Sequence, residues 1–307
     1  MTDSWRISRR SGNLARRAAI IGELRSFFTA RGYLETETPF RIPAPAPESH
    51  IDAVPADGWF LQTSPEICMK RLLAAGYERI FQICRCWRTA ERGSRHLPEF
   101  TMLEWYRTGT DYRGLMEECE ELLREVAKGT GFGQSISFRG KEIRLDASWE
   151  RLSVRESFER YGGMPMEDAL TGGVFDEVVA ERIEPMLGLD RPTFLYDYPA
   201  ELGALARLRA DDPTVAERFE LYIGGLELAN AFSELTDTAE QRSRFMGEAT
   251  VRAARGQLPY PLPEKFLAEL ADMPPAAGIA LGVDRLVMLL LDAERIDDVV
   301  AFTPEEL

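Results

Sequence analysis

The segment RFELYIGGLELANAFSEL (Arg218 to Leu235) constrains the fold of this chain more than any other stretch. Apolar and polar residues alternate on both sides of Gly224-Gly225, and a glycine pair between two such runs is typical of a β-hairpin. Two more strands are predicted over residues 79–88 and 100–107, joined by a polar loop. Strands that pair through hairpins build antiparallel sheets, so we predict an α+β fold and not a doubly wound sheet.

The remaining elements are predicted from apolar spacing, prolines and glycines. Residues 130–215 are expected to form a mixed insertion with helices near 152–160 and 174–186. Elsewhere, strands are predicted over residues 32–40 and 58–64, and helices over 14–28, 65–76, 111–127 and 237–254, with a strand, a turn and a buried helix at the end of the chain.

The composition argues against some classes of protein. The formal net charge is −14, so the chain gains no general electrostatic help in binding nucleic acid. The four cysteines form no CxxC pair, and Cys84 and Cys86 are predicted to be small buried hydrophobes of a reduced, cytoplasmic protein. No segment approaches the length of a membrane span.

The chain contains neither a GxxxxGK[ST] loop nor a GxGxxG motif, so a nucleotide would have to be bound by side chains on a sheet. If the strands over 79–88 and 100–107 pair, alternation brings Arg88, Phe100, Glu104 and Tyr106 to one surface. Arginine suits phosphate and a phenylalanine ring suits a base. A charged hairpin exposed to water is the alternative. The intervening loop adds Arg92, Arg95 and His96.

The glycine hairpin adds carboxylates, which are oxygen ligands of the kind that Mg²⁺ prefers. Glu220 and Glu227 flank its turn, whereas Asn230, Phe232 and Glu234 share one face. Strict alternation puts Glu227 on the opposite face from Glu234, so both serve one site only if a bulge or strong twist intervenes. Solvated acids are the alternative.

The segment GVDRLVMLLL places Arg285 just before an apolar helix, at its N-terminus. The helix dipole and the guanidinium would both favour an anion there. The alternative is a salt bridge between Arg285 and Asp284 or another acid.

Three segments together resemble the signature motifs of class II aminoacyl-tRNA synthetases: GYLETETP motif 1, CWRTAERGSRHLPEFTMLEWY motif 2 and ALGVDRLVMLL motif 3. TSPE at residues 63–66 and the glycine hairpin are similar to the lysyl subgroup. Motif 1 begins near residue 32, which leaves no room for an anticodon-binding domain. The chain therefore resembles the short elongation factor P lysine ligases, with one catalytic domain over residues 1–307.

This resemblance implies an antiparallel sheet flanked by helices, and a homodimer formed through motif 1. It implies ATP-dependent activation of lysine or (R)-β-lysine as an adenylate, with Mg²⁺, and transfer to a lysine side chain of elongation factor P. No tRNA is expected. Part of residues 130–215 is expected to contact the protein acceptor.

The resemblance also implies roles for individual residues. Arg88 would hold the α-phosphate and Arg285 the γ-phosphate, as the catalytic pair. The implied ATP site is Arg88, His96, Phe100, Glu227, Leu228, Gly282 and Arg285; the implied amino-acid site is Ser64, Glu66, Tyr106, Asn230, Phe232, Glu234 and Ala280; the implied Mg²⁺ ligands are Glu220 and Glu227.

Two positions depart from the family pattern. Motif 2 usually reads Arg-Asn-Glu and His-Asn-Pro-Glu-Phe, but here Ala90 replaces the acid and Leu97 replaces the amide. Glu91 would supply the missing carboxylate if the loop is shifted by one residue. A free-standing amino-acid activating enzyme with another acceptor, and a catalytically weak regulatory paralogue, remain open as alternatives.

Overall fold

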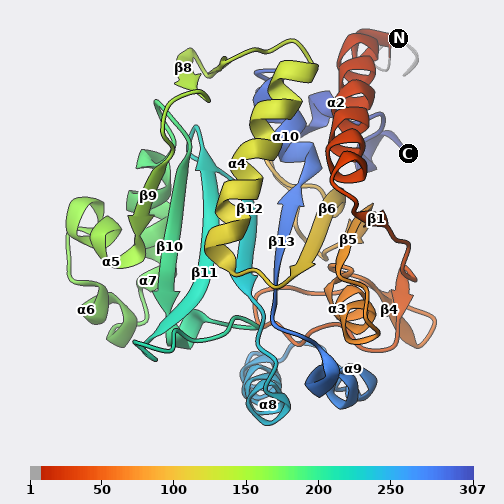
Figure 1. Ribbon diagram of the computed structural model, residues 1–307, viewed down its shortest axis with the longest axis vertical. Coiled ribbons are helices and arrows are strands. Elements are labelled where there is room, and N and C mark those ends of the chain that lie inside the picture. Colours follow the sequence, from red (N-terminus) through yellow and green to blue (C-terminus); the bar gives the residue numbers. More distant parts are fainter. Residues whose placement is uncertain (1–7) are drawn as a thin grey trace.

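The computed structural model describes residues 8–307, and its centre is an eight-stranded sheet (Figure 1). Six central strands run antiparallel to their neighbours, whereas the two edge strands, β1 and β9, pair in parallel. The α+β prediction is confirmed. Across the sheet the order is β1 (Leu34–Glu35), β5 (Arg79–Trp87), β6 (Glu99–Thr108), β13 (Ala276–Gly282), β12 (Leu226–Ser233), β11 (Val215–Ile223), β10 (Thr193–Pro199) and β9 (Glu150–Ser153).

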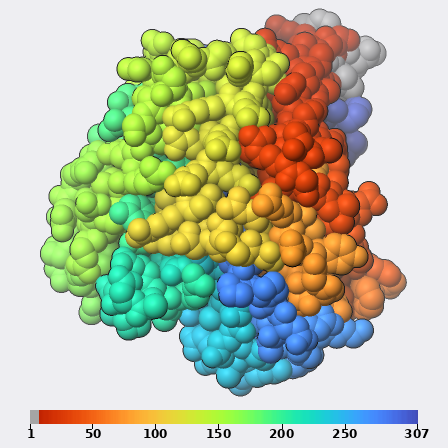
Figure 2. All heavy atoms as spheres, viewed as in Figure 1, coloured from red at the N-terminus to blue at the C-terminus, as the bar shows by residue number. Residues whose placement is uncertain are grey.

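One face of this sheet is covered by α2 (Ser11–Ala30) and α4 (Tyr112–Gly129), and α10 (Val283–Leu290) packs at its upper end (Figure 1). In the same view, the atoms of α2 and α4 close over the strands (Figure 2). Their apolar side chains join those of the strands in the largest core cluster. This face is therefore filled, and any ligand site on the sheet must lie on the opposite face.

Three further helices lie at one end of the sheet: α3 (Glu66–Ala74), α8 (Thr238–Ala254) and α9 (Glu264–Glu269) (Figure 1). They pack around a second core cluster that includes Leu73, Phe245 and Phe266. Beside α3, the proline-rich connection passes through a small sheet of β2 (Arg41–Ile42), β4 (Trp59–Leu61) and β3 (Pro55–Ala56). No helix over residues 8–307 combines the length and the apolar character that crossing a bilayer requires.

The helices expected within residues 130–215 are present but irregular. α5 (Val154–Ser157) continues as a π-helical turn to Gly162, and α7 (Phe175–Val178) continues through π and 3₁₀ turns to Met186. The sequence interpretation missed α6 (Met166–Thr171), the hairpin of β7 (Ser135–Phe138) and β8 (Lys141–Arg144), and the strands β9 and β10. The two missed strands extend the main sheet beyond β11, so this region contributes directly to that sheet.

The strand predicted over residues 32–40 is largely wrong. Only Leu34–Glu35 pair with β5, and they do so in parallel. Tyr33 turns inward, where its hydroxyl donates to the buried carboxylate of Glu118 at 2.8 Å. The last backbone bond of this segment to β5 is from the Thr36 N–H to the carbonyl of Phe81 at 2.8 Å, so the chain has left the sheet before Pro39.

Candidate active site

A cavity lies on the face of the sheet opposite α4. Cross-strand register explains which side chains reach it, because Cys86 pairs with Phe100 and Cys84 with Met102. Both cysteines are buried beneath the cavity, as predicted. The residues of β6 that were expected to share one surface, Phe100, Glu104 and Tyr106, all line the cavity together with Arg88. The sequence prediction for this surface is confirmed.

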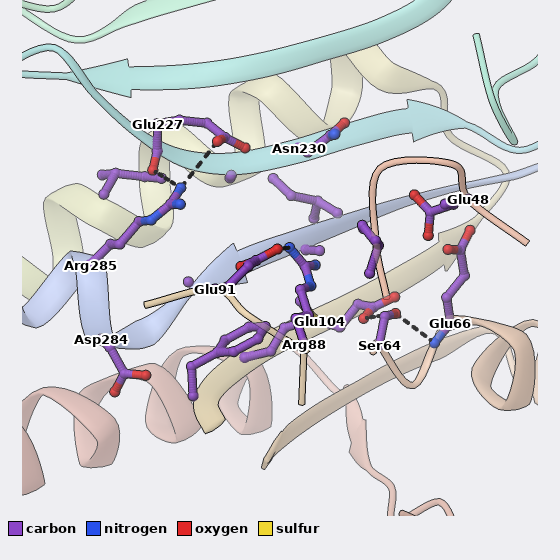
Figure 3. Close-up of a pocket in the computed structure, with 18 of the residues that line it drawn as sticks. Glu48, Ser64, Glu66, Arg88, Glu91, Glu104, Glu227, Asn230, Asp284 and Arg285 are labelled. Carbon is purple, nitrogen blue, oxygen red and sulfur yellow. Dashed lines mark hydrogen bonds and ion pairs between the residues drawn. The ribbon is translucent and has the colours of Figure 1, made fainter. Parts of the chain in front are cut away.

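One end of the cavity carries cations and an aromatic ring. Arg88 follows β5, where its N–H donates to the carbonyl of Pro98 at 2.9 Å, and its guanidinium carbon lies 5.1 Å from the centre of the Phe100 ring. Ala90 adopts a left-handed conformation with φ of +63°. The turn brings Glu91 into the cavity, with its Oε1 3.7 Å from Arg88 Nη1 (Figure 3). A carboxylate is therefore present at this end despite Ala90.

The second arginine of this end is Arg285, in the first turn of α10 rather than just before the helix. Its Nη1 lies 3.1 Å from Glu227 Oε2 (Figure 3), and its Nη2 contacts His96. Burial and the neighbouring Arg285 lower the pKa of His96 below its usual value. The alternative of a salt bridge with another acid is thus present, through Glu227, whereas Asp284 pairs with Arg17 at 2.5 Å. Gly282, directly before α10, also lines the cavity.

A β-bulge lets β12 serve both ends of the cavity. Leu221 pairs with Ala229 but Tyr222 pairs with Glu227, so Leu228 is an extra residue on β12. The bulge reverses the alternation of side chains along the strand. Glu227 and Leu228 therefore line the cavity in addition to Asn230 and Phe232. The sequence interpretation required a bulge or a strong twist if Glu227 was to serve this site, and the bulge is present.

The other end of the cavity is rich in carboxylates. Ser64 donates to Glu104 Oε2 at 2.8 Å (Figure 3). Tyr106 donates to the other oxygen of Glu104. Glu66 and Glu48 line the same end. Burial and the nearby Glu66 raise the pKa of Glu104 to about 8, and the same two causes raise that of Glu48 to about 7. This clustering of unneutralised acids suits a ligand with more than one ammonium group.

Lys70, behind the acidic end of the cavity, is, like Glu48, a residue that the sequence interpretation missed. Its Nζ lies 2.5 Å from Glu66 Oε1 and 2.5 Å from Glu234 Oε2, and its side chain is 1% exposed. Burial lowers the pKa of Lys70, but Glu234 and Glu66 outweigh that effect and the net shift is upward. A sequence signal was available, because a lysine four residues after Glu66 lies on the same helix face as that acid.

The structure places Glu234 differently from the other predicted substrate residues. Its side chain is fully buried against Lys70 and is not among the residues that line the cavity. Asn230, Phe232 and Ala280 do line it. Asn230 Oδ1 accepts a hydrogen bond from Arg218 at 3.2 Å, which fixes the amide.

Of the two predicted Mg²⁺ ligands, only Glu227 lines the cavity. Glu220 accepts from Arg218 at 2.5 Å and from the Tyr222 hydroxyl at 2.6 Å. Within the described part of the chain, no three His, Cys, Asp or Glu side chains are grouped as a preformed metal site. Mg²⁺ is commonly held by one or two carboxylates together with substrate phosphates, and Glu227 beside Arg285 fits that mode of binding.

The comparisons with known proteins agree with this geometry. The family model of class II tRNA synthetases (D, K and N) matches residues 2–306. The elongation factor P–(R)-β-lysine ligase of Pectobacterium atrosepticum is 42% identical over 321 residues, covering 99% of this chain and 98% of that protein. Ligases of the same name from an Enterobacter species and from Salmonella gallinarum are each 41% identical, with 98% of both chains covered. The chain therefore belongs to the class II tRNA synthetases of the D, K and N group and, within them, to the family of elongation factor P–(R)-β-lysine ligases.

Proposed function

We propose that this protein is an ATP-dependent ligase that activates lysine or (R)-β-lysine and transfers it to a lysine side chain of elongation factor P. The observation that carries the proposal is a single cavity with Arg88, Arg285 and Phe100 at one end and four carboxylates at or beside the other. The cationic end suits a nucleoside triphosphate, and the acidic end suits a diamino acid. The names and near-complete coverage of the relatives support the same activity.

In the first step, the amino-acid carboxylate attacks the α-phosphorus of ATP, and the bond from that phosphorus to the bridging oxygen breaks as pyrophosphate leaves. Arg88, beside the Phe100 ring, would hold the α-phosphate and stabilise the charge that develops there. Arg285, near Glu227, would hold the γ-phosphate. Mg²⁺ bound through Glu227 would neutralise phosphate charge. Positioning of the two reactants supplies the remaining rate enhancement.

In the second step, the neutral ε-amine of the acceptor lysine attacks the carbonyl carbon of the adenylate. A carbon–nitrogen bond forms, the bond to AMP breaks, and the amine loses a proton. No covalent enzyme intermediate is required. Glu91 places a carboxylate beside Arg88 despite Ala90, whereas Leu97 lines the cavity without an amide, so we expect adenylation that is weakened but not lost.

We further infer a cytoplasmic homodimer that requires no tRNA. Leu34 and Phe40, in and beside motif 1, are 50% and 48% exposed, which supports an interface at this edge of the sheet. Analytical ultracentrifugation tests the dimer directly.

The experiment that tests the function is amino-acid-dependent ATP–pyrophosphate exchange with α-lysine and with (R)-β-lysine. Arg88→Ala should reduce exchange by at least about a hundredfold, because it removes a charged group that contacts the reacting phosphate. Transfer of labelled amino acid to elongation factor P then tests the acceptor. Exchange that persists in the variant would refute the role of Arg88, and exchange without labelling of elongation factor P would favour another acceptor.

A further inference from the structure

We propose that Glu48 is a specificity-determining residue whose carboxylate, together with that of Glu66, binds one of the two ammonium groups of the amino-acid substrate. This inference rests on the proposed function and goes beyond the residues that the sequence motifs indicate. Glu48 lies in the proline-rich connection after β2, outside all three motifs.

The first argument is the state of the four carboxylates at this end of the cavity. Glu66 and Glu234 share the ammonium of Lys70 at 2.5 Å each, and Glu104 accepts from Ser64 and a tyrosine hydroxyl. The carboxylate of Glu48 has no hydrogen-bond or salt-bridge partner among residues 8–307, and no such bond contributes to its pKa. It is thus the one acid of this group with both carboxylate oxygens available to a ligand.

The second argument is the direction of the side chain. Glu48 lines the cavity, and its carboxylate lies next to that of Glu66, which comes from α3 (Figure 3). Two facing carboxylates repel each other unless a cation lies between them. Lys70 occupies one oxygen of Glu66 and leaves the other free. An ammonium group placed between Glu48 and Glu66 would satisfy both acids.

The third argument is that the segment carrying Glu48 is anchored from behind. The carbonyl of Glu48 accepts from Arg252 Nη1 at 2.8 Å, and the N–H of Ser49 donates to Glu248 at 2.8 Å. Both partners lie on α8. The backbone is therefore held independently of the carboxylate, and the Cα of Glu48 keeps its place at the cavity before any substrate arrives. Such preorganisation is what recognition of a small cation requires.

Electrostatics agrees with this placement. Burial and Glu66 raise the pKa of Glu48 to about 7, although Arg88 and Arg218 oppose the shift. A bound cation would stabilise the charged form of this carboxylate, because it offsets the repulsion from Glu66 that helps to raise the pKa. A single lysine cannot neutralise four carboxylates, whereas α-lysine and (R)-β-lysine each bring two ammonium groups.

The ε-ammonium of the acceptor lysine has the same chemistry, and the experiment separates the two sources. In Glu48→Gln, the KM for α-lysine or (R)-β-lysine in pyrophosphate exchange should rise about 10- to 100-fold, the effect of losing one hydrogen bond to a charged group. The KM for ATP should stay within about twofold. Glu48→Asp should recover part of the loss.

The matched control is Glu248→Ala, which removes the acceptor of the Ser49 N–H, and with it a minor contribution to the raised pKa of Glu48, at a residue outside the cavity lining. An equal rise in KM in this control would attribute the effect to anchoring and overturn the direct contact. An unchanged amino-acid KM in Glu48→Gln would also overturn it, as would a rise confined to the KM for elongation factor P. If the wild-type protein shows no exchange with either amino acid, the proposed function itself fails.

Binding supplies a readout independent of turnover. Lysine and (R)-β-lysine should raise the melting temperature of the wild-type protein at concentrations about 10- to 100-fold lower than those that Glu48→Gln needs. A melting curve without ligand shows whether the variant folds. Equal ligand-induced shifts in the two proteins would contradict the proposal.

Discussion

Replacing Lys70 by methionine tests whether an internal ammonium holds the acidic end of the cavity together. Methionine keeps most of the apolar volume of the lysine stem, so packing changes little. What disappears is the ammonium that contacts both Glu66 Oε1 and Glu234 Oε2, at 2.5 Å each. Glu234 is fully buried, so water cannot take the place of the ammonium.

The magnitude follows from that burial. Removing one partner of a buried ion pair costs about 3–5 kcal/mol, because the remaining charge is left uncompensated. We expect a loss of that size in the free energy of unfolding at pH 8.5. The loss should be smaller at pH 6.5, because burial raises the pKa of Glu234 to about 8 and that carboxyl is then largely neutral in both proteins.

The sign of the pH dependence is fixed by linkage. A carboxyl whose pKa is raised in the folded state binds more protons there than in the unfolded chain, so it contributes less stability as pH rises toward its folded pKa. Without Lys70 that pKa rises further, and the decline continues to higher pH. The penalty grows by up to about 1.4 kcal/mol per pH unit for each carboxyl that stays protonated.

Urea denaturation followed by circular dichroism measures this effect, at both pH values. The double variant Lys70→Met/Glu234→Gln should regain at least about half of the lost stability, because the buried charge is removed with its partner. A single variant within about 1 kcal/mol of the wild type at pH 8.5, or a double variant less stable than the single one, would falsify the reasoning.

Two further predictions concern the same end of the cavity. A Cβ at Gly278 would lie 2.2 Å from Tyr106 Cε1 and 2.6 Å from Glu234 Oε1, so Gly278→Ala should cost about 1–3 kcal/mol in stability and raise the KM for lysine. Gly247→Ala, whose Cβ meets nothing within 4 Å on α8, is the control and should be neutral or stabilising. Lysine binding at pH 7.5 should release up to about a quarter of a proton, the protonated fraction of Glu48 at that pH, because the substrate ammonium lowers its raised pKa. Calorimetry in phosphate and in Tris would then give different heats, and identical heats would contradict the prediction.

Much of the cationic end of the cavity could be predicted from the sequence, for a physical reason. Alternation along two strands fixed the common surface of Arg88 and Phe100 once the strands were assumed to pair, and the observed register agrees. The turn at Gly224-Gly225 was equally predictable, since both residues have positive φ, of +64° and +69°. These features depend on neighbouring residues in the sequence, and tertiary contacts did not change them.

The amino-acid end was less predictable because its contacts join distant segments. Lys70 and Glu234 are far apart in the chain, and no periodicity connects them. Glu48 lies in a segment whose prolines indicate only an extended connection. The strand β10 was missed in a region with no motif. Its strand conformation depends on pairing with β11, a contact that the sequence of β10 alone does not indicate.

The extra residue Leu228 also bears on how this chain can change over evolution. In an ordinary strand, gaining or losing one residue turns every later side chain to the wrong side. Here β12 already carries one extra residue, Leu228, so Glu227 before it and Asn230 after it both face the cavity. Deleting Leu228 would leave a regular strand on which either Glu227 or Asn230 faces the cavity, but not both. Substitution along β12 is therefore open to selection, whereas a change in its length is not.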